Sequence, residues 1–167
     1  MKISATTVIT VSDSCARGEG QDVSGPEACR RLADGGFDVE GPVVVPDEVP
    51  AIAEALRLAT AGSRLVVTTG GTGLTGRDST PEAVQPLFDK TIEGFGEVFR
   101  MLSYELIKTS TIQSRAIAGL ANGTPIFCLP GSPGACKDGW DGIIQHQLDV
   151  RHKPCNLVEL MPRFREQ

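Results

Sequence analysis

The sequence predicts an α/β fold with a single, doubly wound, mostly parallel sheet and helices on both of its faces. Two observations lead to this fold class. Short runs of β-branched and apolar residues alternate along the chain with longer segments of helical periodicity. Several of the helical segments also open with a small polar residue beside a proline, a common start of a helix. At 167 residues the chain fits one domain, so we expect a single domain over 1–167.

The first half of the chain predicts the order strand, helix, strand, helix, strand. TTVITV over 6–11 reads as a buried strand, and a helix over 24–33 follows, opened by Ser-Gly-Pro and ended by two glycines. The segment between them, SDSCARGEGQDVSG, is expected to be a flexible loop. A second strand is expected over 39–45, a helix over 49–58 and a third strand over 65–69. Alternation of this kind favours parallel strand pairing.

The second half continues the alternation with less regular spacing. A helix is expected over 80–88, and GFGEVFRMLSYELI is expected to be helical from about Glu97. STIQSRAIAGLANG carries a polar turn into another apolar stretch, and PIFCL over 125–129 reads as a strand. Ser132 and Pro133 then repeat the polar residue and proline of a helix start.

The segment LVVTTGGTGLTGRDSTPE, residues 65–82, combines a buried strand, a glycine-rich turn and a helix start. Gly70, Gly71 and Gly73 permit backbone angles that other residues resist. Either Thr80 or Ser79 is expected to cap the helix, and in the second case Glu82 completes a capping box. Exposed N–H groups and a helix N-terminus favour a phosphate or carboxylate. A tight structural turn would use the same glycines, so the residues alone leave both readings open.

Four unusual loops follow strands of the predicted sheet. They are Ser12-Asp13, Pro46-Asp47-Glu48, Gly70 to Asp78, and Pro130-Gly131-Ser132. Ligands of such folds bind where the carboxyl ends of the strands meet. Two glycine-rich cradles and at least two acidic residues are what a phosphorylated ligand with Mg²⁺ requires.

Composition excludes several classes of function. A net charge of -5 argues against a nucleic-acid or anionic-membrane surface, and no apolar run approaches the length of a membrane span. The start, MKISATTVITVSD, lacks the apolar core of a secretion signal, so we expect a cytoplasmic protein. Five cysteines without a C-x-x-C pair favour reduced thiols over disulfides or a zinc ribbon. With two histidines in the chain, a histidine-rich metal site is not expected.

Three longer motifs carry a resemblance to a known family. TTGGTGLTGRDSTPEA, IEGFGEVFRMLSYELIKTSTIQSRA and IFCLPGSPGACKDGW resemble the MoaB/MogA family of molybdenum cofactor biosynthesis, and the ending RHKPCNLVELMPR is similar to the MoaB branch. The resemblance implies a molybdopterin-binding fold and a reaction in which molybdopterin attacks the α-phosphorus of ATP. Its products are adenylylated molybdopterin and pyrophosphate, and Mg²⁺ is the implied metal.

The resemblance also assigns residues and partners. Asp47 and Asp78 match the family's two functional aspartates, which we expect to be catalytic and to hold or orient Mg²⁺. The implied substrate contacts are Gly70, Gly71, Thr72, Gly73, Ser114, Arg115, Pro130, Gly131, Ser132 and Pro133. Candidates for the nucleotide side are Ser12, Asp13, Asp22, Ser24 and Gly25, although a solvated loop fits the acidic ones equally. A homotrimer or homohexamer is implied, as is a separate molybdate-insertion protein as partner.

Structural readings stand beside several of these assignments. Taken without the family, Asp47 favours a role as the cap of the following helix, and Asp78 fits an ion pair with Arg77. Cys128 is expected to be a packed thiol and Trp140 to anchor its helix to the core. Two other functions also remain open. One is a non-catalytic molybdopterin-binding or scaffold protein of the same pathway, and the other is a nucleotide-dependent transferase acting on another phosphorylated ligand.

Overall fold

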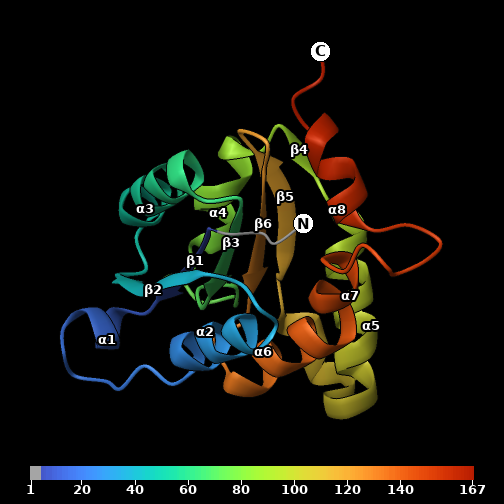
Figure 1. The fold of residues 1–167 in the computed structure, drawn as a ribbon. Helices are drawn as coiled ribbons and strands as arrows, with labels where there is room; N and C mark the ends of the chain where they lie inside the picture. Colours follow the sequence, from blue (N-terminus) through green and yellow to red (C-terminus); the bar gives the residue numbers. More distant parts are fainter. Residues whose placement is uncertain (1–4) are drawn as a thin grey trace.

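The computed structural model describes residues 5–167, in which one six-stranded sheet forms the centre of the fold (Figure 1). The strands are β1 (Thr6–Val11), β2 (Val39–Val45), β3 (Leu65–Thr69), β4 (Lys90–Thr91), β5 (Ile117–Ala121) and β6 (Thr124–Leu129). Their order across the sheet is β2-β1-β3-β6-β5-β4. The first four run parallel, whereas β5 is antiparallel to β6 and β4 to β5. The expected mostly parallel sheet is therefore confirmed.

Helical segments connect the strands. The α-helices are α1 (Asp13–Ala16), α2 (Ser24–Asp34), α3 (Val49–Gly62), α4 (Thr80–Val84), α5 (Glu93–Ile107), α6 (Pro133–Gly139), α7 (Gln145–Gln147) and α8 (Leu157–Leu160). Short 3₁₀ turns cover Gln85–Leu87, Lys108–Gln113 and Met161–Arg163. A π-turn over Trp140–Ile144 joins α6 to α7, so residues 133–147 form one continuous helical stretch.

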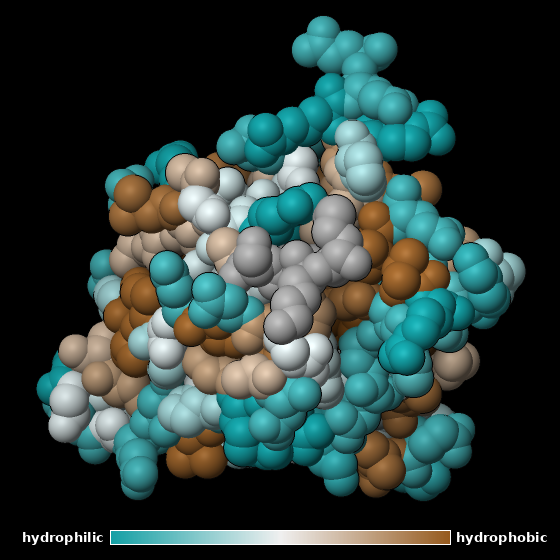
Figure 2. All heavy atoms as spheres, viewed as in Figure 1, coloured by the Kyte–Doolittle hydropathy of each residue, from teal (hydrophilic) through white to brown (hydrophobic). Residues whose placement is uncertain are grey.

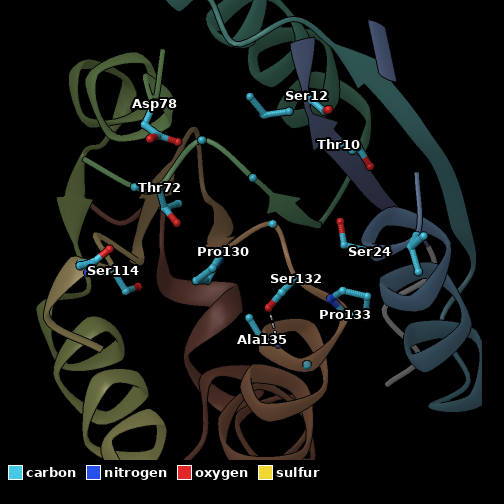
Figure 3. A pocket seen from close by; sticks show the side chains of 18 of the residues that line it. Thr10, Ser12, Ser24, Thr72, Asp78, Ser114, Pro130, Ser132, Pro133 and Ala135 are labelled. Atoms are coloured by element: carbon cyan, nitrogen blue, oxygen red, sulfur yellow. Dashed lines mark hydrogen bonds between the residues drawn. The ribbon is translucent and has the colours of Figure 1, made fainter. Parts of the chain in front are cut away.

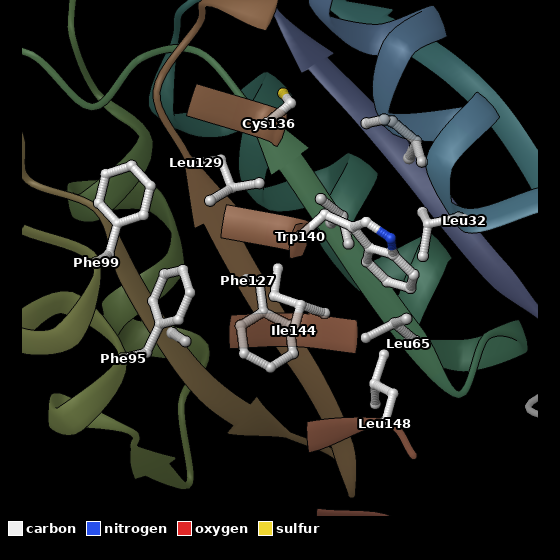
Figure 4. Close-up of a cluster of buried hydrophobic side chains, with 14 of the residues drawn as sticks. Leu32, Leu65, Phe95, Phe99, Phe127, Leu129, Cys136, Trp140, Ile144 and Leu148 are labelled. Carbon is white, nitrogen blue, oxygen red and sulfur yellow. The ribbon is translucent and has the colours of Figure 1, made fainter. Parts of the chain in front are cut away.

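Apolar side chains pack on both faces of the sheet. On one face, Phe127 and Leu65 lie among side chains of α2, α5 and α6 and beside Trp140 of the π-turn that follows α6 (Figure 4). On the other face, Ile9, Val66 and Ile126 pack against α3 and α4. Neighbouring residues of one strand thus enter different clusters, because successive side chains of a strand point to opposite faces. The expectation of helices on both faces is confirmed.

Aromatic packing fixes the position of α6. The indole of Trp140 is 8% exposed and meets the ring of Phe37 edge-on at 5.7 Å between centroids. Cys128 is fully buried, and all five cysteines are free thiols. The expected core roles of Trp140 and Cys128 are therefore confirmed.

The strand order creates a switch point between β1 and β3. The chain leaves β1 for β2 on one side, then crosses over through α3 to β3 on the other side. Thr10 lies opposite Thr69, and Thr69 lies opposite Leu129, so β1, β3 and β6 end at nearly the same level. Loops that leave the strands in opposite directions open a crevice at such a point.

The structure differs from four of the predictions, in one case by an additional helix and in three by the bounds of a helix. The segment expected to be only a flexible loop contains the short helix α1, and α3 continues past residue 58 to Gly62. The helix expected over 80–88 ends at Val84 and tightens into a 3₁₀ turn that contains Pro86. Helix α5 begins at Glu93 rather than about Glu97, since burial of Phe95 against the core outweighs the low helix propensity of the flanking glycines.

The face of the molecule in Figure 2 shows apolar residues in separate patches among hydrophilic ones, with a hydrophilic C-terminal segment at the top. Among residues 5–167, no helix combines the length and the apolar character that crossing a bilayer requires. Residues 1–4, which belong to the start expected to lack a secretion signal, lie outside the described residues.

Candidate active site

A cavity of about 940 Å³ lies at the carboxyl ends of β1, β3 and β6, at the switch point of the sheet (Figure 3). The turns after these three strands form much of its wall, together with α5 and the following 3₁₀ turn. The start of α2, the loop after β2 and α6 contribute further residues. All of the site residues expected from the sequence line this cavity, except Asp13, Gly25 and Arg115. The fold thus brings together three loops that follow Val11, Thr69 and Leu129 and are far apart in the chain.

The first wall of the cavity is the glycine turn after β3. Gly70 and Gly71 have φ angles of +101° and +70°, and a Cβ on Gly70 would collide with the carbonyl oxygen of Val11. Thr80 holds the turn from behind: its hydroxyl donates to the Gly70 carbonyl at 2.9 Å and its N–H to the Gly71 carbonyl at 3.0 Å. Only glycine accommodates both the backbone angles and the closeness of the neighbouring strand end.

The prediction that a serine or threonine hydroxyl caps α4 was wrong. Ser79 occupies the N-cap position, but its side chain makes no capping hydrogen bond, and the Thr80 hydroxyl is bonded to Gly70 instead. The N–H of Ser79 donates to the Oδ1 atom of Asp47 at 2.8 Å. A carboxylate from the loop after β2 therefore accepts the N–H that Glu82 would bond in the expected capping box.

Asp47 lines the cavity and has Asp78 and Asp13 as charged neighbours. It does not cap the following helix, because the N-cap of α3 is Glu48, without a side-chain capping bond. Asp47 is 8% exposed, and its burial raises the pKa of its carboxyl group, with the negative charges of Asp78 and Asp13 adding to the effect. The hydrogen bond from Ser79 opposes the shift. Burial and the two neighbouring carboxylates thus disfavour the ionised form of Asp47, and a bound cation would favour it.

Asp78 is fixed by its own loop. Its Oδ2 atom accepts hydrogen bonds from the N–H and the hydroxyl of Thr75, at 2.9 and 2.7 Å. Burial raises the pKa of Asp78, but the bonds from Thr75 and from the Gly73 N–H, with the charge of Arg115, lower it more, so the net direction is downward. Asp78 is consequently an ionised, oriented carboxylate at neutral pH.

Arg77 is paired with Asp13 rather than with Asp78, so the expected ion pair is wrong. Its Nε and Nη2 atoms reach the two carboxylate oxygens of Asp13, each at 2.8 Å. This fork lowers the pKa of Asp13 to about 2, and a bond from the Asp47 N–H contributes further. The pair ties the loop after β1 to the loop after β3 and leaves Asp13 outside the cavity wall.

Gly25 also lies behind the wall rather than in it. Its N–H donates to Oδ1 of Asp22 at 2.9 Å, and the hydroxyl of Thr10 donates to Oδ2 at 2.7 Å. A Cβ on Gly25 would meet both of these side chains. Gly25 therefore makes room for Asp22, which does line the cavity.

The second glycine-rich turn faces the first. Ser132 is the N-cap of α6 and accepts a hydrogen bond from the N–H of Ala135 at 3.1 Å, followed by Pro133 as the first helical residue. The expected start of this helix is confirmed. A Cβ on Gly131 would lie 3.2 Å from the Cα of Gly70, so the two turns are in close approach.

Several cavity residues escaped the sequence reading. Ser103, Leu106, Ile107 and Ser110 form one wall from α5 and the following 3₁₀ turn, and Asp138 of α6 lies on the same cavity. They lie within two of the motifs that carry the family resemblance, but the sequence analysis assigned them no role in the site. Their spacing of three or four residues is the one signal that they share a helix face, and the sequence offers no way to tell a cavity wall from a packed core.

Asp47 and Asp78 could supply some of the oxygen ligands that a hard cation such as Mg²⁺ takes. Among residues 5–167, no group of three or more histidine, cysteine, aspartate or glutamate side chains is arranged to hold a metal. Asp47 and Asp78 offer two carboxylates, and Mg²⁺ characteristically takes one or two of these and completes its shell with substrate phosphates and water. The buried charge of Asp47 fits such an ion.

Comparison with known proteins identifies the family. A family described as "Probable molybdopterin binding domain" matches residues 7–150, which include every residue that lines the cavity and all of the sheet except Thr6. The chain belongs to this molybdopterin-binding family. It is 48% identical over 152 residues to the Molybdenum cofactor biosynthesis protein B of Escherichia coli, covering 90% of this chain and 88% of the relative. The resemblance to the MoaB/MogA family is therefore confirmed.

Two further comparisons, both with proteins of Pyrococcus furiosus, agree. Its Molybdopterin adenylyltransferase is 44% identical over 140 residues, covering 81% of this chain and 82% of that protein. The crystal structure of its tungsten cofactor synthesizing protein MoaB superposes with a TM-score of 0.78 at 44% identity, covering 86% of this chain and 91% of that one. The fold and the order of its elements are thus those of the family.

Proposed function

We propose that this protein acts in molybdenum cofactor biosynthesis as a molybdopterin adenylyltransferase. In this reaction an oxygen of the terminal phosphate of molybdopterin bonds to the α-phosphorus of ATP, and the bond from that phosphorus to the pyrophosphate oxygen breaks. The products are adenylylated molybdopterin and pyrophosphate. The name of the Pyrococcus furiosus relative and the membership in the molybdopterin-binding family support the assignment.

The observation that carries the proposal is the pairing of two carboxylates with a glycine cradle in one cavity. Asp47 and Asp78 are close enough for the charge of Asp78 to raise the pKa of Asp47, and Gly71 lies beside Asp47. The cavity volume of about 940 Å³ is at the upper end of the usual range for small-molecule sites, about 300–1,000 Å³. A site of this size suits two substrates bound side by side.

Asp47 and Asp78 are the residues that would hold Mg²⁺. When bound, the ion supplies charge neutralisation for the phosphates of the nucleotide. The chain itself contributes position: the Ser79 N–H orients Asp47, and Thr75 orients Asp78. Fixed orientation of two reactants accounts for about 7–11 kcal/mol of a reaction barrier when it is complete.

The remaining wall divides between the two substrates in this proposal. The turn from Gly70 to Gly73, with Ser132 opposite, cradles the terminal phosphate of molybdopterin through main-chain N–H groups and a hydroxyl. Ser12, Asp22 and Ser24 lie on the nucleotide side, along the start of α2 and the loop after β1.

We also propose that the chain is a single cytoplasmic domain that assembles into a homotrimer or homohexamer and passes its product to a molybdate-insertion protein. Exposed apolar side chains on α5 and after it support the assembly; Met101, Leu106 and Ile112 are 61%, 64% and 77% exposed. Sedimentation equilibrium of the purified protein distinguishes a trimer or hexamer from a monomer, and a monomer at micromolar concentration would refute the assembly.

The function is tested by following adenylylated pterin and pyrophosphate in an assay with molybdopterin, ATP and Mg²⁺. The wild-type protein is expected to form both products. An Asp78→Asn variant keeps the size of the side chain but loses a full negative charge, so turnover should fall by at least a hundredfold. Asp149→Asn removes a carboxylate that is bonded to Arg151 and does not line the cavity, so this matched control should keep wild-type turnover. Pterin binding by the wild type without either product would favour the non-catalytic binding protein.

A further inference from the structure

Among the expected substrate contacts, Arg115 is the one that lies outside the cavity wall. Its side chain is instead hydrogen-bonded to the loop after β3 and to α4. Its Nε atom donates to the Gly73 carbonyl at 2.8 Å, and its Nη2 atom donates to the Asp78 carbonyl at 2.9 Å. Its Nη1 and Nη2 atoms also reach the two carboxylate oxygens of Glu82. The main-chain N–H of Arg115 donates to the Thr72 carbonyl at 2.8 Å.

These bonds occupy most of the hydrogen-bonding capacity of the guanidinium group. A guanidinium carries five N–H donors, and these four side-chain bonds engage all three of its nitrogen atoms. One N–H of Nη1 remains, so a bidentate contact with a phosphate would break at least one of these bonds. Arg115 is also paired with a carboxylate of opposite charge, which reduces its attraction for a second anion.

The bonded carbonyls lie at the two ends of one short loop. Gly73 begins the segment and Asp78 ends it, while the Asp78 N–H donates to the Thr75 carbonyl at 3.1 Å within it. The guanidinium therefore joins both ends of the loop from outside, and Glu82 at the start of α4 holds the guanidinium in place. The next N–H along the chain, that of Ser79, is the donor to Asp47.

We propose that Arg115 and Glu82 form a clasp that positions the two aspartates of the site, rather than a contact for the substrate. The clasp fixes the loop from Gly73 to Asp78, and the loop fixes the Asp78 carboxylate and the donor to Asp47. Arg115 is thus a positioning residue for AMP transfer. This inference rests on the proposed function, because it assigns Arg115 its role through Asp78 and Asp47.

The geometry explains why arginine stands at this position. Two carbonyls and one carboxylate must be bonded at once, and the planar fork of arginine presents donors in three directions. A lysine ammonium has the same charge but is a single point of donation on a flexible stem, so it cannot bridge both carbonyls and Glu82 in this arrangement. Charge alone would therefore not restore the function of the clasp.

The decisive variant is Glu82→Gln, with Glu27→Gln as its matched control. Both glutamates lie in the first turn of a helix, are bonded to arginines and stand outside the cavity wall. Glu27 is bonded to Arg30 and Arg31, whereas Glu82 is bonded to Arg115. The clasp predicts that Glu82→Gln lowers kcat by roughly tenfold or more, the usual effect of losing a second layer of support, with the Kd for molybdopterin unchanged. Arg115→Lys should do the same, and Glu27→Gln should leave both quantities at their wild-type values.

A substrate contact predicts a different pattern. If Arg115 bound a phosphate of molybdopterin, Arg115→Lys would raise the Kd for the pterin, and Glu82→Gln would free the guanidinium and leave the Kd unchanged or lower it, with kcat preserved. That pattern would overturn the clasp.

A measurement without turnover separates failure of the clasp from failure of the proposed function. Hydrogen–deuterium exchange reports the N–H groups of Thr75 and Ser79, which are bonded to the two aspartates. Glu82→Gln and Arg115→Lys should speed exchange in a peptide spanning residues 72–80 and leave other peptides unchanged. Wild-type exchange in both variants would overturn the clasp even if the protein proved inactive, whereas faster exchange in an inactive protein would refute only the adenylyltransferase.

Discussion

Replacement of Gly70 by alanine tests the closeness of the glycine turn to the end of β1. At a φ of +101° an alanine bears a backbone strain of about 1–2 kcal/mol, and its Cβ would overlap the Val11 carbonyl oxygen. The Cβ would lie far inside van der Waals contact with that backbone oxygen, and bond-angle bending moves it by only a few tenths of an ångström, so the backbone must also shift, at roughly 1–3 kcal/mol. Gly70→Ala should therefore lower the free energy of unfolding by about 2–5 kcal/mol, which lowers the Tm of a chain of this size by roughly 4–20 °C.

Gly76→Ala is the control from the same loop. A Cβ on Gly76 meets no atom within 4 Å, and its φ is not in the left-handed range. This variant should be neutral or more stable by up to about 1 kcal/mol, because alanine loses less backbone entropy on folding. Urea unfolding of both variants, monitored by circular dichroism, gives the two differences. Equal stability of Gly70→Ala and Gly76→Ala would refute the reasoning from strain and close approach.

Three other outcomes are expected. Asp47→Asn should raise the free energy of unfolding at pH 7 in the absence of Mg²⁺. The pKa of Asp47 is raised in the folded state, so ionisation of its carboxyl group destabilises the fold as the pH rises. The gain in stability should therefore shrink near pH 4 and below, where the wild-type carboxyl group is protonated. Urea titrations at pH 7 and pH 4 measure this, and a loss of stability at pH 7 would contradict it. Leu56→Ala removes a fully buried side chain of α3 and should cost about 2–5 kcal/mol in the same assay. Iodoacetamide should label the exposed Cys155 in the folded protein, but not Cys128, whose burial raises its pKa to about 12; mass spectrometry of the peptides shows which thiol reacts first.

The sequence predicted the parts of the fold that local patterns determine. TTVITV and LVVTT are short runs rich in β-branched residues, which favour strands. The Ser132-Pro133 start of α6 is a local capping signal. The predicted start of α5 was wrong because it rested on the low helix propensity of Gly94 and Gly96, which is a local quantity. The burial of Phe95, which extends the helix, depends on strands far away in the chain.

The site shows the same division. The loops after the strands could be expected to converge, because the fold class itself determines where parallel strands end. The partners within the site could not: Arg77 bonds to Asp13 across 64 residues, and Asp47 receives its donor from Ser79 across 32. A residue's neighbours in sequence indicate its chemistry, while its partners in space depend on the exact approach of separate loops.

The most direct test of the proposed reaction uses ATP labelled at the α-phosphorus and, in parallel, at the γ-phosphorus, with purified protein, molybdopterin and Mg²⁺. AMP transfer predicts that the α-label appears on the pterin and the γ-label in pyrophosphate. A γ-label on the pterin would indicate phosphoryl transfer instead, and pterin that binds but stays unlabelled in both experiments would contradict catalysis by Asp47 and Asp78.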